Sequence, residues 1–159
     1  VISIQLKRVE GGPSALSYTQ LASGSSNAVL TIIPELLWAT AAFRPEQNPE
    51  IIRVFNDMAW ITFLWPVGTF VVQVVATGLA TLGDKNERPI FPRWFGFFCL
   101  WCAMLFLPGV MLIFFKTGPF AWNGLLVFWL GVLAFFGWYT VTFVVVRTSI
   151  LRHWQEALA

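Results

Sequence analysis

WFGFFCLWCAMLFLPGVMLIFF, residues 94–115, and TGPFAWNGLLVFWLGVLAFFGWYTVTFVVV, residues 117–146, contain no charged side chain. As a helix, each stretch is long enough, at ~1.5 Å per residue, to cross a hydrocarbon layer of ~30 Å. Two more uncharged stretches lie upstream, at residues 11–34 and 58–83. A chain that crosses lipid must satisfy its backbone hydrogen bonds internally, so the sequence predicts an all-α, polytopic transmembrane helix bundle.

The composition supports the same class. Hydrophobic residues make up 57% of the chain, aromatic residues 17% and charged residues 11%, which leaves too little polar surface for a soluble globule. The net charge is +2, and no basic cluster is interleaved with aromatic residues, so we do not expect nucleic acid as a partner. The expected surroundings are a lipid bilayer and other membrane protein subunits.

Prolines, glycines and charged residues divide this single transmembrane domain, residues 1–159, into its elements. We predict four complete spans followed by an amphipathic interfacial helix, at about residues 18–43, 55–82, 94–115, 120–146 and 147–159. Residues 1–6, with Lys7 and Arg8 after them, are typical of the end of a preceding span. Pro34 and Pro66 predict bends in the first two spans. A tight turn predicts that the third and fourth spans are antiparallel neighbours.

The basic residues are divided unevenly between the two ends of the predicted bundle. One end carries Lys7, Arg8, Lys85, Arg88, Arg93, Arg147 and Arg152, and the other carries Arg44, Arg53 and Lys116. The basic-rich side of a membrane protein is usually cytoplasmic. We therefore predict a multi-pass protein of the plasma (inner) membrane with a cytoplasmic C-terminus.

Glu35 is the only acidic or basic side chain well inside a predicted span. An unpaired carboxylate there costs roughly 2.5–3.5 kcal/mol. Arg53 and Asp57 enter the same half of the bilayer from the next helix, and Gln73 lies deeper on it. We predict that Glu35, Arg53, Asp57 and Gln73 form a buried polar cluster. It could serve as a proton or ligand site or as an ion pair that fixes helix packing, and the lack of a catalytic motif favours the structural interpretation.

A run of small and polar residues occupies the first half of the first span, at residues 22–28. Gly24 and Ala28 are four residues apart and therefore lie on one side of a helix. Small residues let membrane helices approach closely, so we predict that Gly24 and Ala28 form a helix-packing face.

Cys99 and Cys102 form a C-x-x-C sequence inside the third span. In soluble redox proteins this spacing opens a helix after a strand, whereas here it lies within an apolar helix. Packing is the favoured interpretation and a redox role is the alternative. A second pair of ligands for zinc is absent from the sequence.

Motifs of the common membrane and soluble enzymes are missing from the sequence. Its only histidine, His153, lies in the predicted tail, so no pair of intramembrane histidines exists to hold haem, copper or a di-iron centre. The sequence has no P-loop, G-x-S-x-G or H-E-x-x-H motif either. We predict no cofactor, no metal site and no catalytic residue.

Three loop motifs, RPEQNPE (residues 44–50), RPIFPRW (88–94) and FFKTGPFAWNGLL (114–126), resemble multi-pass membrane proteins of unknown function from actinobacteria such as mycobacteria and rhodococci. The resemblance implies a lineage and no reaction. In such bacteria, small proteins of this kind are candidate accessory subunits of larger assemblies, including Mce-type lipid importers.

We therefore expect a non-catalytic accessory or scaffold subunit of a bacterial membrane complex. Two alternatives stay open at this point. One is a carrier or channel component that uses Glu35 within the membrane. The other is a membrane thiol oxidoreductase that uses Cys99 and Cys102.

Overall fold

The computed structural model describes residues 1–12 and 14–158, and every regular element in these ranges is a helix. In chain order the elements are α1 (Ile2–Val9), α2 (Ala15–Leu30), α3 (Ile32–Phe43), α4 (Pro49–Leu64), α5 (Val67–Leu82), α6 (Arg93–Phe106), the 3-10 helix η1 (Leu107–Phe114), the π-helix η2 (Leu125–Trp129) and α7 (Leu130–Leu158). Within the described residues, four helical stretches are long and apolar enough to span a membrane: Ala15–Phe43, Pro49–Leu82, Arg93–Phe114 and Leu125–Glu156. The predicted all-α fold with four membrane-spanning helices is confirmed.

Proline residues interrupt three of the four stretches. The helix breaks between α2 and α3 at Thr31, three residues before Pro34, and between α4 and α5 at Pro66. Proline has no backbone N–H and crowds the preceding turn, which explains both bends. The third stretch changes from α-helix to 3-10 helix next to Pro108. The helix is therefore interrupted at Pro66 and three residues before Pro34, near both positions where the sequence predicts bends.

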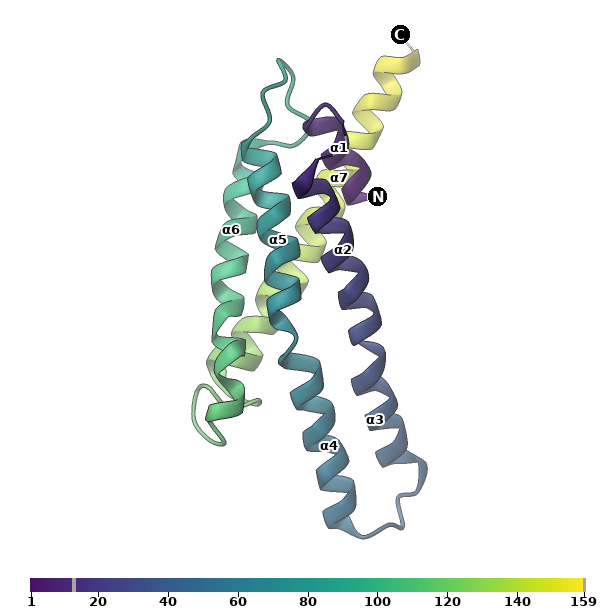
Figure 1. Cartoon of the computed structure of the whole chain (residues 1–159), viewed down its shortest axis with the longest axis vertical. Coiled ribbons are helices and arrows are strands. Elements are labelled where there is room, and N and C mark those ends of the chain that lie inside the picture. The colour runs from purple at the N-terminus through teal and green to yellow at the C-terminus, as the bar shows by residue number, and fades with distance from the viewer. Residues whose placement is uncertain (13, 159) are drawn as a thin grey trace.

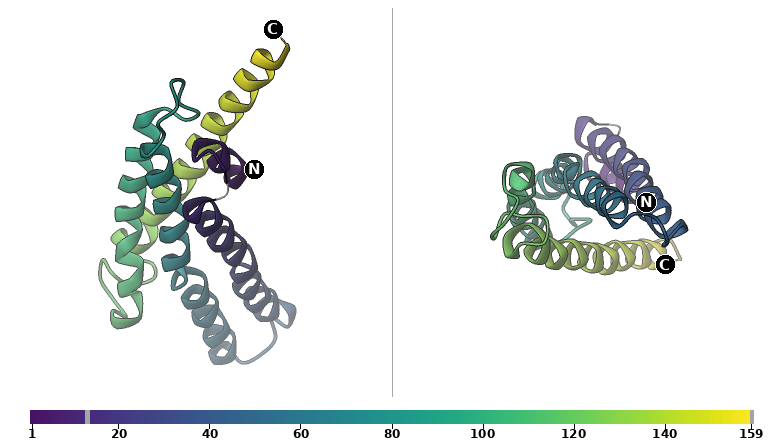
Figure 2. Two further views of the ribbon diagram at one scale, coloured as in Figure 1. Left: turned by 45° about the horizontal axis from the view of Figure 1, so that its top comes forward. Right: turned by 90° about the horizontal axis from the view of Figure 1, so that it is seen from below.

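The arrangement is a bundle from which one helical hairpin extends (Figures 1 and 2). Helix α5 packs against α2 on one side and α6 on the other, and α7 packs against α6 and crosses behind α5 in the view of Figure 1. The predicted pairing of the third and fourth spans is confirmed. Helices α3 and α4 pack mainly against each other and reach beyond the turn that joins α6 to α7 (Figure 1).

The two chain ends and the loop of residues 83–92 lie at one end of the bundle (Figure 1). Helix α1 packs there against α2, where Leu6 is buried and the Ser3 hydroxyl donates to the Ser17 carbonyl at 3.2 Å. The opposite end carries the hairpin loop, residues 44–48, and the turn between α6 and α7. This arrangement separates the two groups of basic residues as the sequence predicts.

The core is formed where α5, α6 and α7 meet. Gly78 and Gly96 allow α5 and α6 to touch, since a Cβ built on Gly78 would lie 3.0 Å from the Gly96 carbonyl oxygen. Trp138 of α7 is fully buried and makes an edge-to-face contact with Phe70 at 5.2 Å between ring centroids. Helix α5, which follows Pro66, is therefore packed closely against both α6 and α7.

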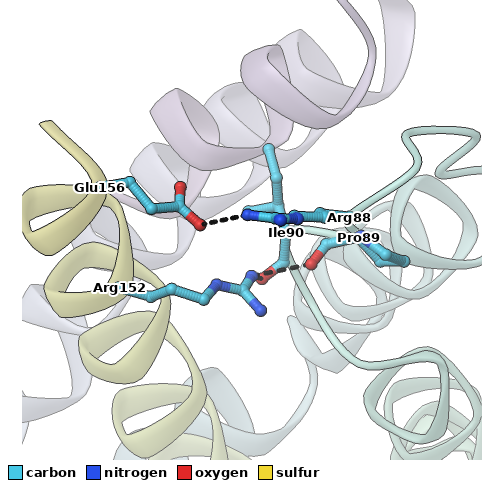
Figure 3. Close-up of polar contacts among 5 residues, drawn as sticks. All are labelled: Arg88, Pro89, Ile90, Arg152 and Glu156. Carbon is cyan, nitrogen blue, oxygen red and sulfur yellow. Dashed lines mark hydrogen bonds and ion pairs between the residues drawn. The ribbon is translucent and has the colours of Figure 1, made fainter. Parts of the chain in front are cut away.

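The C-terminal tail continues α7 without interruption to Leu158, and the last residue of the predicted tail, Ala159, lies outside the described residues. The guanidinium of Arg152 donates to the carbonyl oxygens of Pro89 and Ile90 at 2.7 and 2.9 Å (Figure 3). Arg88 pairs with Glu156 at 3.7 Å in the same view. The tail is thus an extension of the last membrane helix that is attached to the 83–92 loop.

Candidate functional site

The structure does not bring Glu35, Arg53, Asp57 and Gln73 together. The side chains of Glu35, Arg53 and Asp57 are exposed on α3 and α4. Among the described residues the one ion pair joins Arg88 to Glu156, far from these helices. Gln73 is buried and bonds to Asn27 of α2.

The antiparallel register of α3 and α4 explains why the predicted cluster is not formed. Trp38 lies edge-on against Trp60, at 4.9 Å between ring centroids. Glu35 precedes Trp38 by about one helical turn, and Arg53 precedes Trp60 by about two turns on the opposite helix. The Glu35 and Arg53 side chains therefore lie on opposite sides of the Trp38–Trp60 contact.

The same tryptophans mark the level at which the bundle ends. Trp122, in the turn after η1, stacks on Trp60 at 4.9 Å between ring centroids. Helices α6 and η1 together rise roughly 37 Å before that turn, which is enough to cross the hydrocarbon layer. Tryptophan is enriched at membrane–water interfaces, and Lys116 lies in the same turn. We therefore place Trp60 at one interface of the hydrocarbon layer.

The part of the hairpin beyond Trp60 and Trp38, residues 39–59, is called the hairpin tip below. Its helical part in α4 is roughly 16 Å long, whereas the headgroup layer on each side of a bilayer is about 5–7 Å thick. Phe43 and Val54 at the tip are 78% and 55% exposed, and Ile51 and Met58 are also exposed. A membrane interaction site or a protein interface is expected where exposed apolar side chains gather.

A cavity of about 400 Å³ lies on the other side of Trp60, between α2, the start of α5 and α7. Its wall is mostly apolar and includes the aromatic residues Trp60, Phe63, Phe70, Phe106, Phe128, Phe135, Phe136 and Tyr139. Its volume falls in the range of ~300–1,000 Å³ that is typical of small-molecule sites. Pro66, at the break between α4 and α5, also lines the cavity.

One wall of the cavity carries a chain of polar side chains. The Thr69 hydroxyl donates to Asn27 Oδ1, and Asn27 Nδ2 donates to Gln73 Oε1 at 3.0 Å. Asn27 and Gln73 both line the cavity. This chain links α2 to α5 within the membrane-spanning part of the bundle.

The predicted small-residue face lies beside this chain. A Cβ built on Gly24 would lie 3.3 Å from both Cδ and Nε2 of Gln73, so the carboxamide rests against the glycine backbone. Ala28, one turn later, lines the cavity. Gly24 therefore lies at the α2–α5 contact, and Ala28 borders the open space next to it.

Cys99 and Cys102 are free thiols that are buried in α6. Cys99 accepts a hydrogen bond from the Trp138 indole at 3.4 Å, and its Cβ is in the α5–α6 contact at Gly78. Neither cysteine lines the cavity. Both side chains take part in core packing, and among the described residues no three histidine, cysteine or acidic side chains gather as a metal site would require.

Asn27, Thr69 and the aromatic wall were not predicted as a site. Asn27 is an amide within an uncharged stretch, and such a residue usually faces protein rather than lipid. That signal could have singled it out, but its partners depend on how α2 and α5 align. Comparisons with protein-family models, curated proteins and solved structures found no match to the chain.

Proposed function

We propose that the protein is a non-catalytic accessory subunit of a larger membrane complex and that its hairpin tip docks onto a partner subunit. The observation that supports this most is the set of exposed apolar side chains beyond the interface level of Trp60: Phe43, Ile51, Val54 and Met58. Leaving such side chains in water is unfavourable by roughly 25 cal/mol per Å² of apolar surface. A protein surface would cover them.

The charges of the tip fit a surface that lies outside the hydrocarbon layer. Arg44, Glu46, Glu50, Arg53 and Asp57 are all exposed and interspersed with the apolar side chains. Interfaces between subunits commonly combine an apolar centre with a polar, solvent-accessible rim. We propose a partner of the same type, with apolar side chains at its centre and mixed charges around them.

The distribution of basic residues supports a cytoplasmic C-terminus in the plasma membrane, which would place the hairpin tip outside the cell. The resemblance of the loop motifs to actinobacterial membrane proteins makes an Mce-type lipid importer the assembly that we propose to examine first. The partner subunit would then carry an external or membrane-embedded surface that meets the tip.

The two alternatives have less support. Glu35 does not line the cavity, which a carrier based on this carboxylate would require. Cys99 and Cys102 are enclosed in the core, whereas reactive thiols are typically accessible to their substrates. Neither arrangement suggests transport through Glu35 or thiol exchange at these cysteines.

Quantitative co-purification with matched variants tests the proposal. The double variant Phe43→Ala/Val54→Ala removes apolar surface from the tip, and Phe143→Ala/Val144→Ala removes the same side chains from exposed positions of α7, where they are 68% and 55% exposed. The full chain is purified in mild detergent, and partner subunits are quantified by mass spectrometry. We expect the tip variant to lose at least about tenfold of a stoichiometric partner, and the α7 variant to retain it. Equal recovery from both variants would contradict the proposal.

A further inference from the structure

We propose that the aromatic cavity is a binding site for an uncharged lipid with a carbonyl oxygen, which accepts a hydrogen bond from the Gln73 side-chain amide. The inference rests on the cavity between α2, α5 and α7 and does not depend on the hairpin tip or on a partner subunit. Three observations lead to it: the orientation of the polar chain, the free amide at its end and the uncharged aromatic wall.

The orientation of the polar chain follows from the single hydrogen of the Thr69 hydroxyl. This oxygen is close to two acceptors, the Pro66 carbonyl and Asn27 Oδ1, and Asn27 Oδ1 is the nearer. The Pro66 carbonyl can accept both this hydroxyl and the backbone N–H of Thr69, so the shorter contact to Asn27 Oδ1 decides the orientation. The hydroxyl therefore donates to Asn27 Oδ1, which turns Asn27 Nδ2 toward Gln73 Oε1.

Gln73 then presents its Nε2 group, which carries two N–H donors, on the side away from Asn27. No acceptor for Nε2 is found in the part of the chain that the structure describes, although the Gln73 residue is only 7% exposed. Among the described residues, two side-chain atoms are both fully enclosed and without a hydrogen-bond partner, Glu10 Oε2 and Thr142 Oγ1. Gln73 Nε2 is not one of them, so this unpaired nitrogen is not fully enclosed by protein. Gln73 therefore offers an unused donor beside Gly24, and both residues line the cavity.

A donor without an acceptor is costly at this depth. Gln73 lies roughly 15 Å along α5 from the end of that helix, near the middle of a ~30 Å hydrocarbon layer. An unsatisfied polar group in hydrocarbon costs several kcal/mol, and lipid chains cannot accept a hydrogen bond. A ligand with an acceptor oxygen would satisfy Gln73 while its apolar body fills the aromatic part of the cavity.

The wall defines the chemical class of the ligand. None of the residues that line the cavity is charged, so a charged headgroup would lack a counter-charge there. Apart from the polar chain and the two threonines Thr31 and Thr62, the wall is formed by aromatic rings, aliphatic side chains and glycines. A carbonyl on an apolar body fits both features, and it can come from a ring ketone, as in a quinone, or from an acyl ester, as in a diacylglycerol.

Binding measurements in lipid nanodiscs distinguish these two sources. Menadione supplies a ring carbonyl, 1,2-dioctanoylglycerol supplies ester carbonyls, and dodecane supplies hydrocarbon alone. Thermal unfolding of the full chain is followed at increasing concentrations of each probe, because a ligand that binds the folded state raises Tm. We expect a saturable rise with at least one carbonyl probe and no saturable rise with dodecane.

Two variants connect binding to the cavity. Gly131 lines it, and a Cβ built there meets nothing within 4 Å, so Gly131→Leu should occupy the cavity without disturbing its neighbours. Gly137 on the same helix is equally unobstructed but does not line the cavity, which makes Gly137→Leu the matched control. We expect Gly131→Leu to abolish the Tm rise and Gly137→Leu to retain it.

A third variant tests the hydrogen bond. Gln73→Leu should raise the Kd of the carbonyl probe roughly three- to tenfold, the change that one hydrogen bond accounts for. Gly131→Leu keeps the polar chain intact, so the inference stays testable if Gln73→Leu fails to fold. Equal responses to dodecane and the carbonyl probes, no response to either carbonyl probe, or an unchanged Kd in folded Gln73→Leu would overturn the proposal.

Discussion

Helix α5, which packs between α2 and α6, and the hairpin of α3 and α4 both belong to stretches that could span a membrane, but they differ in what covers them. In α5 most side chains of the last three turns are buried, whereas α3 and α4 bury only Pro34 and Ala59. Helices α4 and α5 belong to one stretch that is apolar enough to span a membrane, Pro49–Leu82, and α3 belongs to another, Ala15–Phe43. Hydropathy alone therefore identifies a helix that suits lipid but does not show whether lipid, water or protein surrounds it.

The physical cause of the difference is the number of neighbouring helices, because α5 packs against both α2 and α6 whereas α3 and α4 pack mainly against each other. Glycines at 78 and 96 let α5 and α6 approach until backbone touches side chain. In the hairpin, α3 and α4 contact each other through the large rings of Trp38, Trp60 and Phe63. Close packing buries surface on both sides of α5, whereas the hairpin leaves its outer faces free.

The largest effect is expected from removing the core indole. Trp138→Ala should lower the free energy of unfolding by about 3–5 kcal/mol, because a fully buried aromatic side chain leaves a cavity between α5, α6 and α7. Trp129→Ala, at an exposed position of η2, is the control and should change stability far less. Chemical or thermal unfolding in detergent measures both. Similar losses would mean that the bundle core is not where the structure places it.

A smaller effect is expected at the glycine contact. Gly96→Val introduces a Cβ that would lie 2.6 Å from Leu82 Cγ and 3.1 Å from the Gly78 carbonyl oxygen, so Leu82 or the two helices must shift, at a cost of about 1–3 kcal/mol. Gly137→Val, where a Cβ meets nothing within 4 Å, provides the comparison. Thermal unfolding should show a lower Tm for Gly96→Val only. An unchanged Tm of Gly96→Val would contradict the close packing of α5 against α6 that distinguishes the bundle from the hairpin.

The smallest effect is expected where the tail meets the loop. Arg152→Ala removes the hydrogen bonds to the Pro89 and Ile90 carbonyls, which are exposed and contribute little to global stability. Hydrogen exchange should speed up at residues 83–92 and in the last turns of α7 while the bundle core stays protected. The matched variant Arg147→Ala, on the same helix without such a bond among the described residues, should leave exchange in the loop unchanged.

Much of the fold could be predicted from uncharged length and proline positions. The four predicted spans overlap the four observed stretches, and the breaks occur at Pro34 and Pro66 because proline acts through local geometry. The last helix is the largest departure: it begins at Leu130 after a π-helix and includes the tail, since nothing after Val146 interrupts it. Uncharged length and proline positions do not reveal that the fourth predicted span and the predicted tail form one helix.

The sites depended on information that is not local. The prediction of the Glu35 cluster took the depth of Glu35 in the membrane from its distance to Phe43, the end of the first predicted span. This assumes that all spans end at the same level of the membrane. In the structure the stacking of Trp122 on Trp60 shows that the hairpin extends past the other helices. The polar chain from Thr69 to Gln73 likewise requires the register between α2 and α5, which no single helix encodes. The role of Gly24 beside Gln73 became visible only with that register.

Site-specific photo-crosslinking in intact cells tests most directly whether the hairpin tip meets protein while the bundle faces lipid. A photoreactive residue is placed at Val54 or at Val144, two valine positions of equal exposure on the isolated chain. We predict a discrete protein adduct from position 54 and mainly lipid adducts from position 144. Lipid adducts from both positions would contradict the account, because the hairpin tip would then be an ordinary membrane-facing surface.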